Sequence, residues 1–159
     1  MIHDTATITV PDVPPIPGLT FRRYCGASDI PSLVELMTAV EIADGTFEIL
    51  TVENIANLYA NRNDFDPERD LLVAEIDGRL VAYSEQLRSI RDGGRVYDTS
   101  GWVHPDHRRR GLGRAMLGYG EARQRERAAA VEAAGETRAA QLGSWIAQTE
   151  IGNTAMLEG

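Results

Sequence analysis

An arginine-rich turn with two glycines, between an extended segment and a long helical pattern, most constrains the fold. Residues 97–103 form an aromatic-rich extended run, and three consecutive arginines follow at 108–110. Gly111 and Gly113 then open a segment whose apolar positions recur at helical spacing. The first N–H groups of a helix have no intrahelical partner, and the helix dipole favours negative charge there. Because glycine allows close approach and arginine supplies charged donors, the turn predicts a pyrophosphate site.

Two common phosphate-binding motifs do not fit this turn. A dinucleotide-binding motif needs a third small residue, where this chain has Met116. A P-loop needs Gly-Lys-Ser/Thr, and the chain contains no lysine. What remains is Arg-x-x-Gly-x-Gly starting at Arg108, preceded by Val103-x-Pro105 and followed by Ala115-Met116-Leu117.

This combination resembles the acetyl-CoA-binding motif of the Gcn5-related N-acetyltransferase (GNAT) family. The resemblance extends over roughly residues 19–157, because the expected order of strands and helices also fits. It implies an α/β fold with a mixed, mostly antiparallel sheet flanked by helices. It also implies transfer of an acetyl (acyl) group from acetyl-CoA to an amine, by direct attack in a ternary complex.

The resemblance also implies which residues bind the cosubstrate. Backbone groups around Trp102 and Val103 would pair with the pantetheine arm like an added strand. Backbone N–H groups of Arg109 to Arg114 would hold the pyrophosphate, and an arginine of 108–110 would contact phosphate or the adenine-ribose. The predicted cofactor-binding set is Trp102, Val103, Arg108, Arg109, Arg110, Gly111, Leu112, Gly113, Arg114, Ala115 and Asn153.

Asn153 matches an asparagine that follows the fifth strand in this family. In many members a tyrosine farther along protonates the leaving thiolate, and a final helix and strand pair follow. Counting forward from Asn153 passes Gly159, so we expect residues 19–159 to be an acetyltransferase-like domain truncated at its C-terminus. The chain is then either a fragment of a longer protein, such as a tandem one, or lacks the usual general acid. A non-catalytic CoA-binding domain is the alternative function, and a nucleotide-binding module without acyl chemistry is a third.

Residues 1–18 are predicted to form a proline-rich arm ahead of this domain. The patterns predict strands at 19–24, 71–76, 80–90 and 95–103, and one within 137–148 that runs parallel to its neighbour. Helices are predicted from a Ser28 cap to Ile42, from a Thr51 cap, and from Gly111 to about Ala134. The predicted inward positions are Leu33, Leu36, Met37, Val40, Ile55, Leu58, Tyr59, Leu112, Ala115, Met116 and Tyr119.

Two carboxylates in the predicted meander are the candidate catalytic residues. If residues 91–94 form the turn, Ile90 faces Arg95 and Glu85 faces Ser100. Glu85 and Asp98 then lie diagonally on one sheet face, about 7 Å apart. Such a pair can raise one pKa toward that of a useful base, or it can bind a cationic substrate. A solvated edge is the alternative, and a bulge would change the register.

The amino-acid composition narrows the possible classes of function and ligand. The chain has 159 residues, 43% hydrophobic and 25% charged, as expected of one globular domain. Its net charge of −8 disfavours nucleic-acid binding, and no apolar run is long enough to span a membrane. Cys25 is the only cysteine, so we expect a cytoplasmic location. His104 and His107 have a metal-like spacing without a third ligand, so we expect loop residues and no metal. The amine acceptor stays open, as does pairing with a second acetyltransferase-like domain or a homodimer.

Overall fold

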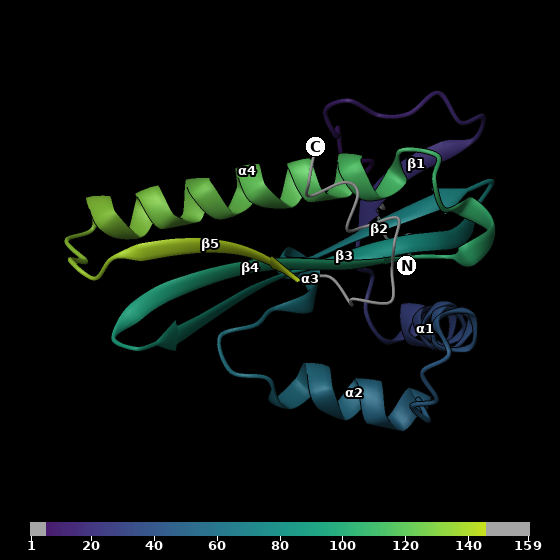
Figure 1. Ribbon diagram of the computed structural model, residues 1–159, viewed down its shortest axis with the longest axis horizontal. Coiled ribbons are helices and arrows are strands. Elements are labelled where there is room, and N and C mark those ends of the chain that lie inside the picture. The colour runs from purple at the N-terminus through teal and green to yellow at the C-terminus, as the bar shows by residue number, and fades with distance from the viewer. Residues whose placement is uncertain (1–5, 146–159) are drawn as a thin grey trace.

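The computed structural model describes residues 6–145, which form a five-stranded sheet with helices on both faces (Figure 1). The strands lie in the order of the sequence: β1 (Leu19–Arg23), β2 (Leu71–Ile76), β3 (Arg79–Arg91), β4 (Gly94–Val103) and β5 (Ala140–Trp145). Neighbouring strands are antiparallel, except that β5 runs parallel to β4. The predicted mixed, mostly antiparallel sheet is therefore confirmed.

Two layers of helices cover the sheet. Figure 1 shows α1 (Ile30–Asp44) and α2 (Val52–Asn61) on one face and the long α4 (Leu112–Ala133) on the other. Three short helical turns join these elements: η1 (Ala27–Asp29), α3 (Pro67–Asp70) and η2 (Pro105–His107). None of the helices in the described part of the chain is both long and apolar enough to span a membrane.

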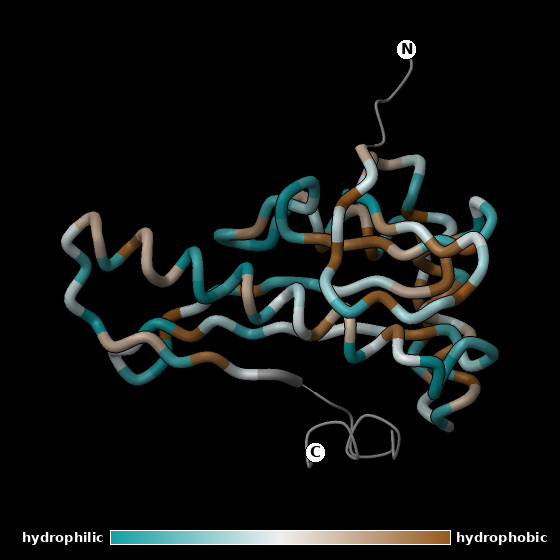
Figure 2. Tube along the Cα trace, turned by 90° about the horizontal axis from the view of Figure 1, so that it is seen from above, coloured by the Kyte–Doolittle hydropathy of each residue, from teal (hydrophilic) through white to brown (hydrophobic). Residues whose placement is uncertain are grey.

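Each helical layer has its own hydrophobic core against the sheet. The core under α1 and α2 includes Leu33, Leu36, Val40, Ile55, Leu71, Val73 and Tyr83. The core under α4 includes Phe21, Leu72, Ala74, Val81, Leu112, Ala115 and Met116. In Figure 2 most of the brown hydrophobic stretches lie in the half of the molecule where the chain is most densely packed. The sheet is thus anchored from both sides where β4 leads into α4.

Two Asp-Gly turns set the register of the central hairpins. Asp77-Gly78 and Asp92-Gly93 both have positive φ at both residues, the conformation that fits the twist of a two-residue hairpin. Ile90 consequently pairs with Arg95, and Glu85 with Ser100, as the sequence predicts. A register shift occurs at Ala74/Glu75 in β2, whereas the β3–β4 pairs run without interruption.

Two local predictions are wrong. Ser28 does not cap α1, because η1 extends through Asp29 and α1 starts only at Ile30. The Asp29 carboxylate binds Arg22 and the N–H of Cys25 instead of an α1 N–H. Leu58 is 40% exposed, since α2 buries only the side of the helix that carries Ile55 and Tyr59. By contrast, the predicted Thr51 cap is confirmed, because its hydroxyl accepts from the N–H of Asn54 at 3.1 Å.

The described part of the N-terminal arm packs against the domain. The N–H of Ile8 donates to the carbonyl of Phe21 at 2.8 Å, and Thr7 forms an antiparallel bridge with Arg22 of β1. Val10 is only 5% exposed and belongs to the core under α4. The prolines therefore interrupt regular structure in the arm without preventing it from being buried.

Candidate active site

The turn between β4 and α4 has the backbone of an anion site. Arg109 and Gly111 both have positive φ, 64° and 92°, and Gly111 is the N-cap of α4. A glycine N-cap has no side chain to accept hydrogen bonds from the first-turn N–H groups. The N–H groups that begin α4 therefore receive no side-chain cap from Gly111, which is compatible with the predicted anion site.

The residues that open α4 hold the helix in place with their side chains. Leu112 is 1% exposed, and Ala115 and Met116 are each 3% exposed, in the core under α4. On the outer side, Pro14 of the arm lies against Gly111, where an added Cβ would be 3.2 Å from the Cβ of Pro14. Leu112 and Ala115 can therefore serve a ligand only through their backbone.

The four arginines of the turn, at 108–110 and 114, have different surroundings. Arg108 donates from Nη1 and Nη2 to the two carboxylate oxygens of Asp44, at 2.7 and 3.1 Å. Its Nε donates to the carbonyl of Val103 at 3.2 Å. Arg110 lies 3.1 Å from His107, while Arg109 and Arg114 complete the positive charge of the turn. The guanidinium of Arg108 thus faces α1 in this structure, rather than the start of α4.

The two histidines have local roles in the same turn. His104 accepts the N–H of Asp106 at 3.2 Å and caps η2. The pKa of His107 is lowered, first by burial and then by the charge of Arg110. No group of three or more potential metal ligands occurs within residues 6–145.

Beyond Ser100, the described residues leave one edge of β4 without a strand partner. The last pair between β4 and β5 is Ser100 with Trp145, so Gly101 to Val103 continue alone on that side. On the other side, the N–H of His104 donates to the carbonyl of Val81 at 2.8 Å. Because antiparallel strands alternate in hydrogen-bonding direction, the backbone groups of Gly101 and Val103 point to the open edge. An extended amide chain could add to this edge as a strand.

The alternating hydrogen-bonding direction along β4 changes which residues are expected to present backbone groups at its open edge. Trp102 pairs with Tyr83 in register, and its ring stacks on that of Tyr83 with centroids 4.7 Å apart. Its backbone therefore faces β3, and Gly101 rather than Trp102 presents backbone groups to the open edge. Counting the register from the Asp92-Gly93 turn could have identified Gly101, because the alternation is fixed there.

A buried polar cluster lies on the α1 and α2 side of the sheet. Glu85 is 4% exposed; it accepts from Tyr59 Oη at 3.4 Å and from Arg62 Nη1 at 3.1 Å. Burial raises the pKa of the Glu85 carboxyl, and the charge and hydrogen bond of Arg62 lower it in part. The buried hydroxyl of Tyr83 has no hydrogen-bond partner among the described residues, and burial raises its pKa. The sequence predicts Tyr59 as an inward position, but it gives no indication that Tyr59 or Arg62 contacts Glu85, since that contact depends on how α2 packs.

Asp98 occupies the predicted diagonal position but has its own cation. It pairs with Leu87 in β3, two residues along from Glu85, so the alternation puts both carboxylates on one face. Asp98 accepts from Arg91 Nη2 at 2.8 Å and is 8% exposed. Each carboxylate is therefore neutralised by a different arginine.

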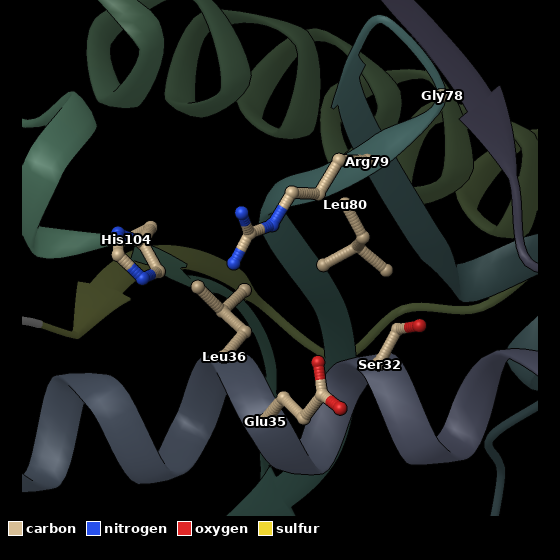
Figure 3. A pocket seen from close by; sticks show the side chains of 7 residues that line it. All are labelled: Ser32, Glu35, Leu36, Gly78, Arg79, Leu80 and His104. Carbon is tan, nitrogen blue, oxygen red and sulfur yellow. The ribbon is translucent and has the colours of Figure 1, made fainter.

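A separate polar cavity of about 250 Å³ lies beside the turn, on the α1 side of the sheet. Figure 3 shows Arg79 and His104 lining it from the sheet side and Glu35 from α1. The cavity thus has both positive and negative groups on its walls. Asn153, the remaining member of the predicted set, lies outside the described residues.

Comparisons with known proteins identify the family. The model of the acetyltransferase (GNAT) family matches residues 36–145, which is more than half of the chain. The chain therefore belongs to the GNAT acetyltransferase family, whose members use acetyl-CoA. No curated protein matches the sequence.

Solved structures agree with this assignment. A GCN5-related N-acetyltransferase from Sphaerobacter thermophilus superposes with a TM-score of 0.71 at 22% identity, over 94% of this chain and 43% of that one. A predicted acetyltransferase from Clostridium acetobutylicum, solved with acetyl-CoA, gives a TM-score of 0.60 at 17% identity, over 88% of this chain and 87% of that one. A ribosomal-protein-alanine N-acetyltransferase from Brucella melitensis gives 0.53 at 30% identity over 67% of each chain. The chain thus spans less than half the length of the Sphaerobacter protein.

Proposed function

We propose that the protein is an N-acetyltransferase that moves an acetyl group from acetyl-CoA to the amine of a small molecule or peptide. The observation that carries this proposal is the edge of β4 that residues 6–145 leave open beside the start of α4. The edge offers backbone groups for a pantetheine arm, and α4 offers N–H groups for a pyrophosphate. The two features are consecutive in the chain, as the pantetheine and pyrophosphate are in CoA.

In the proposed complex, Gly101 and Val103 pair with the pantetheine. The N–H groups from Arg109 to Arg114 hold the pyrophosphate, and the side chains of Arg109, Arg110 and Arg114 add charge. Asn153 remains a predicted contact of the pantetheine. This arrangement would place the thioester near the edge of β4, across that strand from Glu85.

The reaction needs a neutral amine, a polarised carbonyl and a proton for the leaving thiolate. The amine nitrogen forms a bond to the thioester carbon, the C–S bond breaks, and CoA leaves as a thiolate that takes up a proton from solvent. A backbone N–H near Val103, at the edge of β4, polarises the carbonyl. Glu85 is the proposed acceptor of the amine proton, because its burial favours the protonated form that the transfer creates. Asp98 stays a predicted second acidic group, one that could draw a cationic acceptor to this face.

Binding of the cosubstrate is tested first. Acetyl-CoA and CoA should raise the melting temperature in a thermal-shift titration, and ATP should compete poorly. If neither acetyl-CoA nor CoA stabilised the protein, the proposal would be contradicted, whereas strong competition by ATP would favour a nucleotide-binding module. Calorimetry on the same protein gives the dissociation constant.

Turnover is tested by release of free thiol with a panel of amines. Aminoglycosides, peptides with N-terminal alanine and simple amino acids are suitable acceptors, since solved neighbours are named for the first two classes. Glu85→Gln should lower kcat by about 100- to 10,000-fold while CoA binding is retained. Asp98→Asn is the matched variant, on the same face but paired with Arg91, and should lower kcat less.

A second candidate is a non-catalytic CoA-binding domain within a tandem protein. It is favoured by one observation, that the chain aligns to 43% of the Sphaerobacter protein. In that case CoA would bind, yet no amine would release thiol, even when the domain is expressed with any flanking sequence of its reading frame.

A further inference from the structure

The side chain of Arg108 joins the cofactor turn to the end of α1. Its guanidinium makes a two-pronged ion pair with Asp44, the last residue of that helix, at 2.7 and 3.1 Å. The Asp44 side chain is 8% exposed and that of Arg108 is 28% exposed. A paired, mostly buried geometry of this kind fixes orientation as well as distance.

The same side chain also reaches the end of β4. Arg108 Nε donates to the carbonyl of Val103 at 3.2 Å. That carbonyl lies at the open edge of β4, so the contact occupies one of its two lone pairs, while the N–H of Val103 is the donor offered to a ligand. One guanidinium therefore connects β4, the turn and α1.

The turn that follows needs such support. Arg109 has a φ of 64°, a left-handed conformation that costs a non-glycine residue free energy unless the surroundings hold it. Gly111, two residues on, has a φ of 92°. Because Arg108 immediately precedes Arg109, fixing its side chain at both Asp44 and Val103 restricts the backbone at the start of this conformation.

We propose that Arg108 is a positioning residue that acts together with Asp44, rather than a phosphate ligand. The Arg108–Asp44 pair holds residues 108–114 in the anion-binding conformation. The phosphates are then contacted by the backbone N–H groups and by neighbouring arginines. The inference rests on the proposed function, because it assigns the part of the site that receives CoA.

The Asp44→Asn variant distinguishes this role by the sign of its effect. Removing a negative charge near the turn, and releasing Arg108 toward the phosphates, would tighten CoA binding if simple electrostatics governed the site. If the pair positions the turn, affinity should instead fall by about 10- to 100-fold. Asp106→Asn is the matched control, since its side chain is 83% exposed in the same turn and should leave affinity unchanged or slightly raised.

The kinetic readout separates positioning from general damage. For Asp44→Asn, KM for acetyl-CoA should rise, while kcat at saturating acetyl-CoA and KM for the amine should change little. Arg108→Lys is the second variant, which keeps the charge but cannot make the fork and the Val103 contact together. It should also weaken CoA binding, and unchanged or tighter binding in both variants would overturn the inference.

A ligand-free readout keeps this inference separate from the proposed function. The turn contains three consecutive arginines, so trypsin can cut within 108–110 when the backbone opens. Without ligand, cleavage there should be several-fold faster in Asp44→Asn than in the wild type or in Asp106→Asn, as seen by mass spectrometry. Equal cleavage rates would contradict the positioning role. A wild type that binds no CoA would contradict the proposed function, while faster cleavage in Asp44→Asn would still support the role of the pair in ordering the turn.

Discussion

At the scale of single residues, Glu85 is in surroundings that oppose its ionisation. Burial raises its pKa, and Arg62 is the nearest group that lowers it. A carboxylate must be deprotonated to accept a proton, so kcat/KM should rise with pH through the pKa of this group. The acid limb of the pH–rate profile therefore includes the titration of Glu85 together with that of the amine acceptor, and a variant near Glu85 separates the two.

Replacing Arg62 should shift the acid limb of the pH–rate profile. In Arg62→Met, the charge and hydrogen bond that lower the pKa of Glu85 are lost, so this pKa rises further and the acid limb of kcat/KM shifts to higher pH. Arg91→Met is the control, because Arg91 pairs with Asp98 instead. If the limb shifted in Arg91→Met and not in Arg62→Met, Asp98 rather than Glu85 would be the base.

The hydroxyl of Tyr83 gives a second prediction at this scale. It is buried without a hydrogen-bond partner among the described residues, which costs free energy in the folded state. Tyr83→Phe keeps the ring that stacks on Trp102, so the free energy of unfolding should stay the same or rise by up to about 1 kcal/mol. Urea denaturation measures this, and a clear loss of stability would mean that the hydroxyl has a partner.

Register was predictable at this scale, whereas side-chain partners were not. The Asp92-Gly93 turn fixes which residues face each other, so counting outward put Glu85 opposite Ser100 correctly. The partners Tyr59 and Arg62 come from a helix distant in sequence, and only its packing brings them to Glu85. The contact between Arg108 and Asp44 has the same origin, so the motif alone could not reveal it.

At the scale of elements, α4 packs on β4 through a glycine. A Cβ on Gly120 would lie 2.4 Å from Thr99 Cγ2, and the β-branched threonine has little freedom to move away. Gly120→Ala should therefore lower the free energy of unfolding by about 1–3 kcal/mol, as overpacking does. The double variant with Thr99→Ser should recover part of this loss.

Gly118 of the same helix is the matched control for this prediction. Apart from its chain neighbours and the backbone of its own helix, no described atom lies within 4 Å of a Cβ added there. Gly118→Ala should raise the stability by about 0.5–1 kcal/mol, because alanine favours a helix over glycine. Chemical denaturation of both variants distinguishes close packing from helix propensity, and equal effects would contradict the close approach.

Long, periodic elements were the easiest to predict from the sequence. The apolar spacing of α4 and its end before Gly135 agree with the structure, because packing and propensity favour the same conformation. The start of α1 was less predictable, since Asp29 binds Arg22 across from β1 and so has a partner that a local capping rule does not consider. Leu58 shows that a narrow helix face can leave an apolar residue in solvent.

At the scale of the whole molecule, the arm contributes to the core under α4. Val10 is 5% exposed, whereas Val13 in the same arm is 44% exposed. Val10→Ala should lower the free energy of unfolding by about 1–2 kcal/mol through lost burial. Val13→Ala should change it by less than about 0.5 kcal/mol. Thermal and urea denaturation of the pair test this, and equal effects would mean that the arm does not stay packed.

The prolines of the arm explain why its packing was not predicted. Prolines indicate a break in regular structure, and four of them occur within residues 11–17. The apolar residues of the arm therefore follow no helix or strand periodicity from which their burial could be predicted. Burial of an irregular segment depends on the surface it meets, here Phe21 and the start of α4. Only the folded chain shows that surface.

The bridge between Thr7 and Arg22 has a consequence for solubility. β1 is an outer strand of the sheet, and the unpaired backbone of an outer strand can template association between molecules. By pairing with β1 at this point, the arm covers part of the strand edge and should reduce edge-to-edge aggregation. A variant shortened to begin at Leu19 would expose that edge. We therefore expect this variant to self-associate, to an extent that grows with protein concentration.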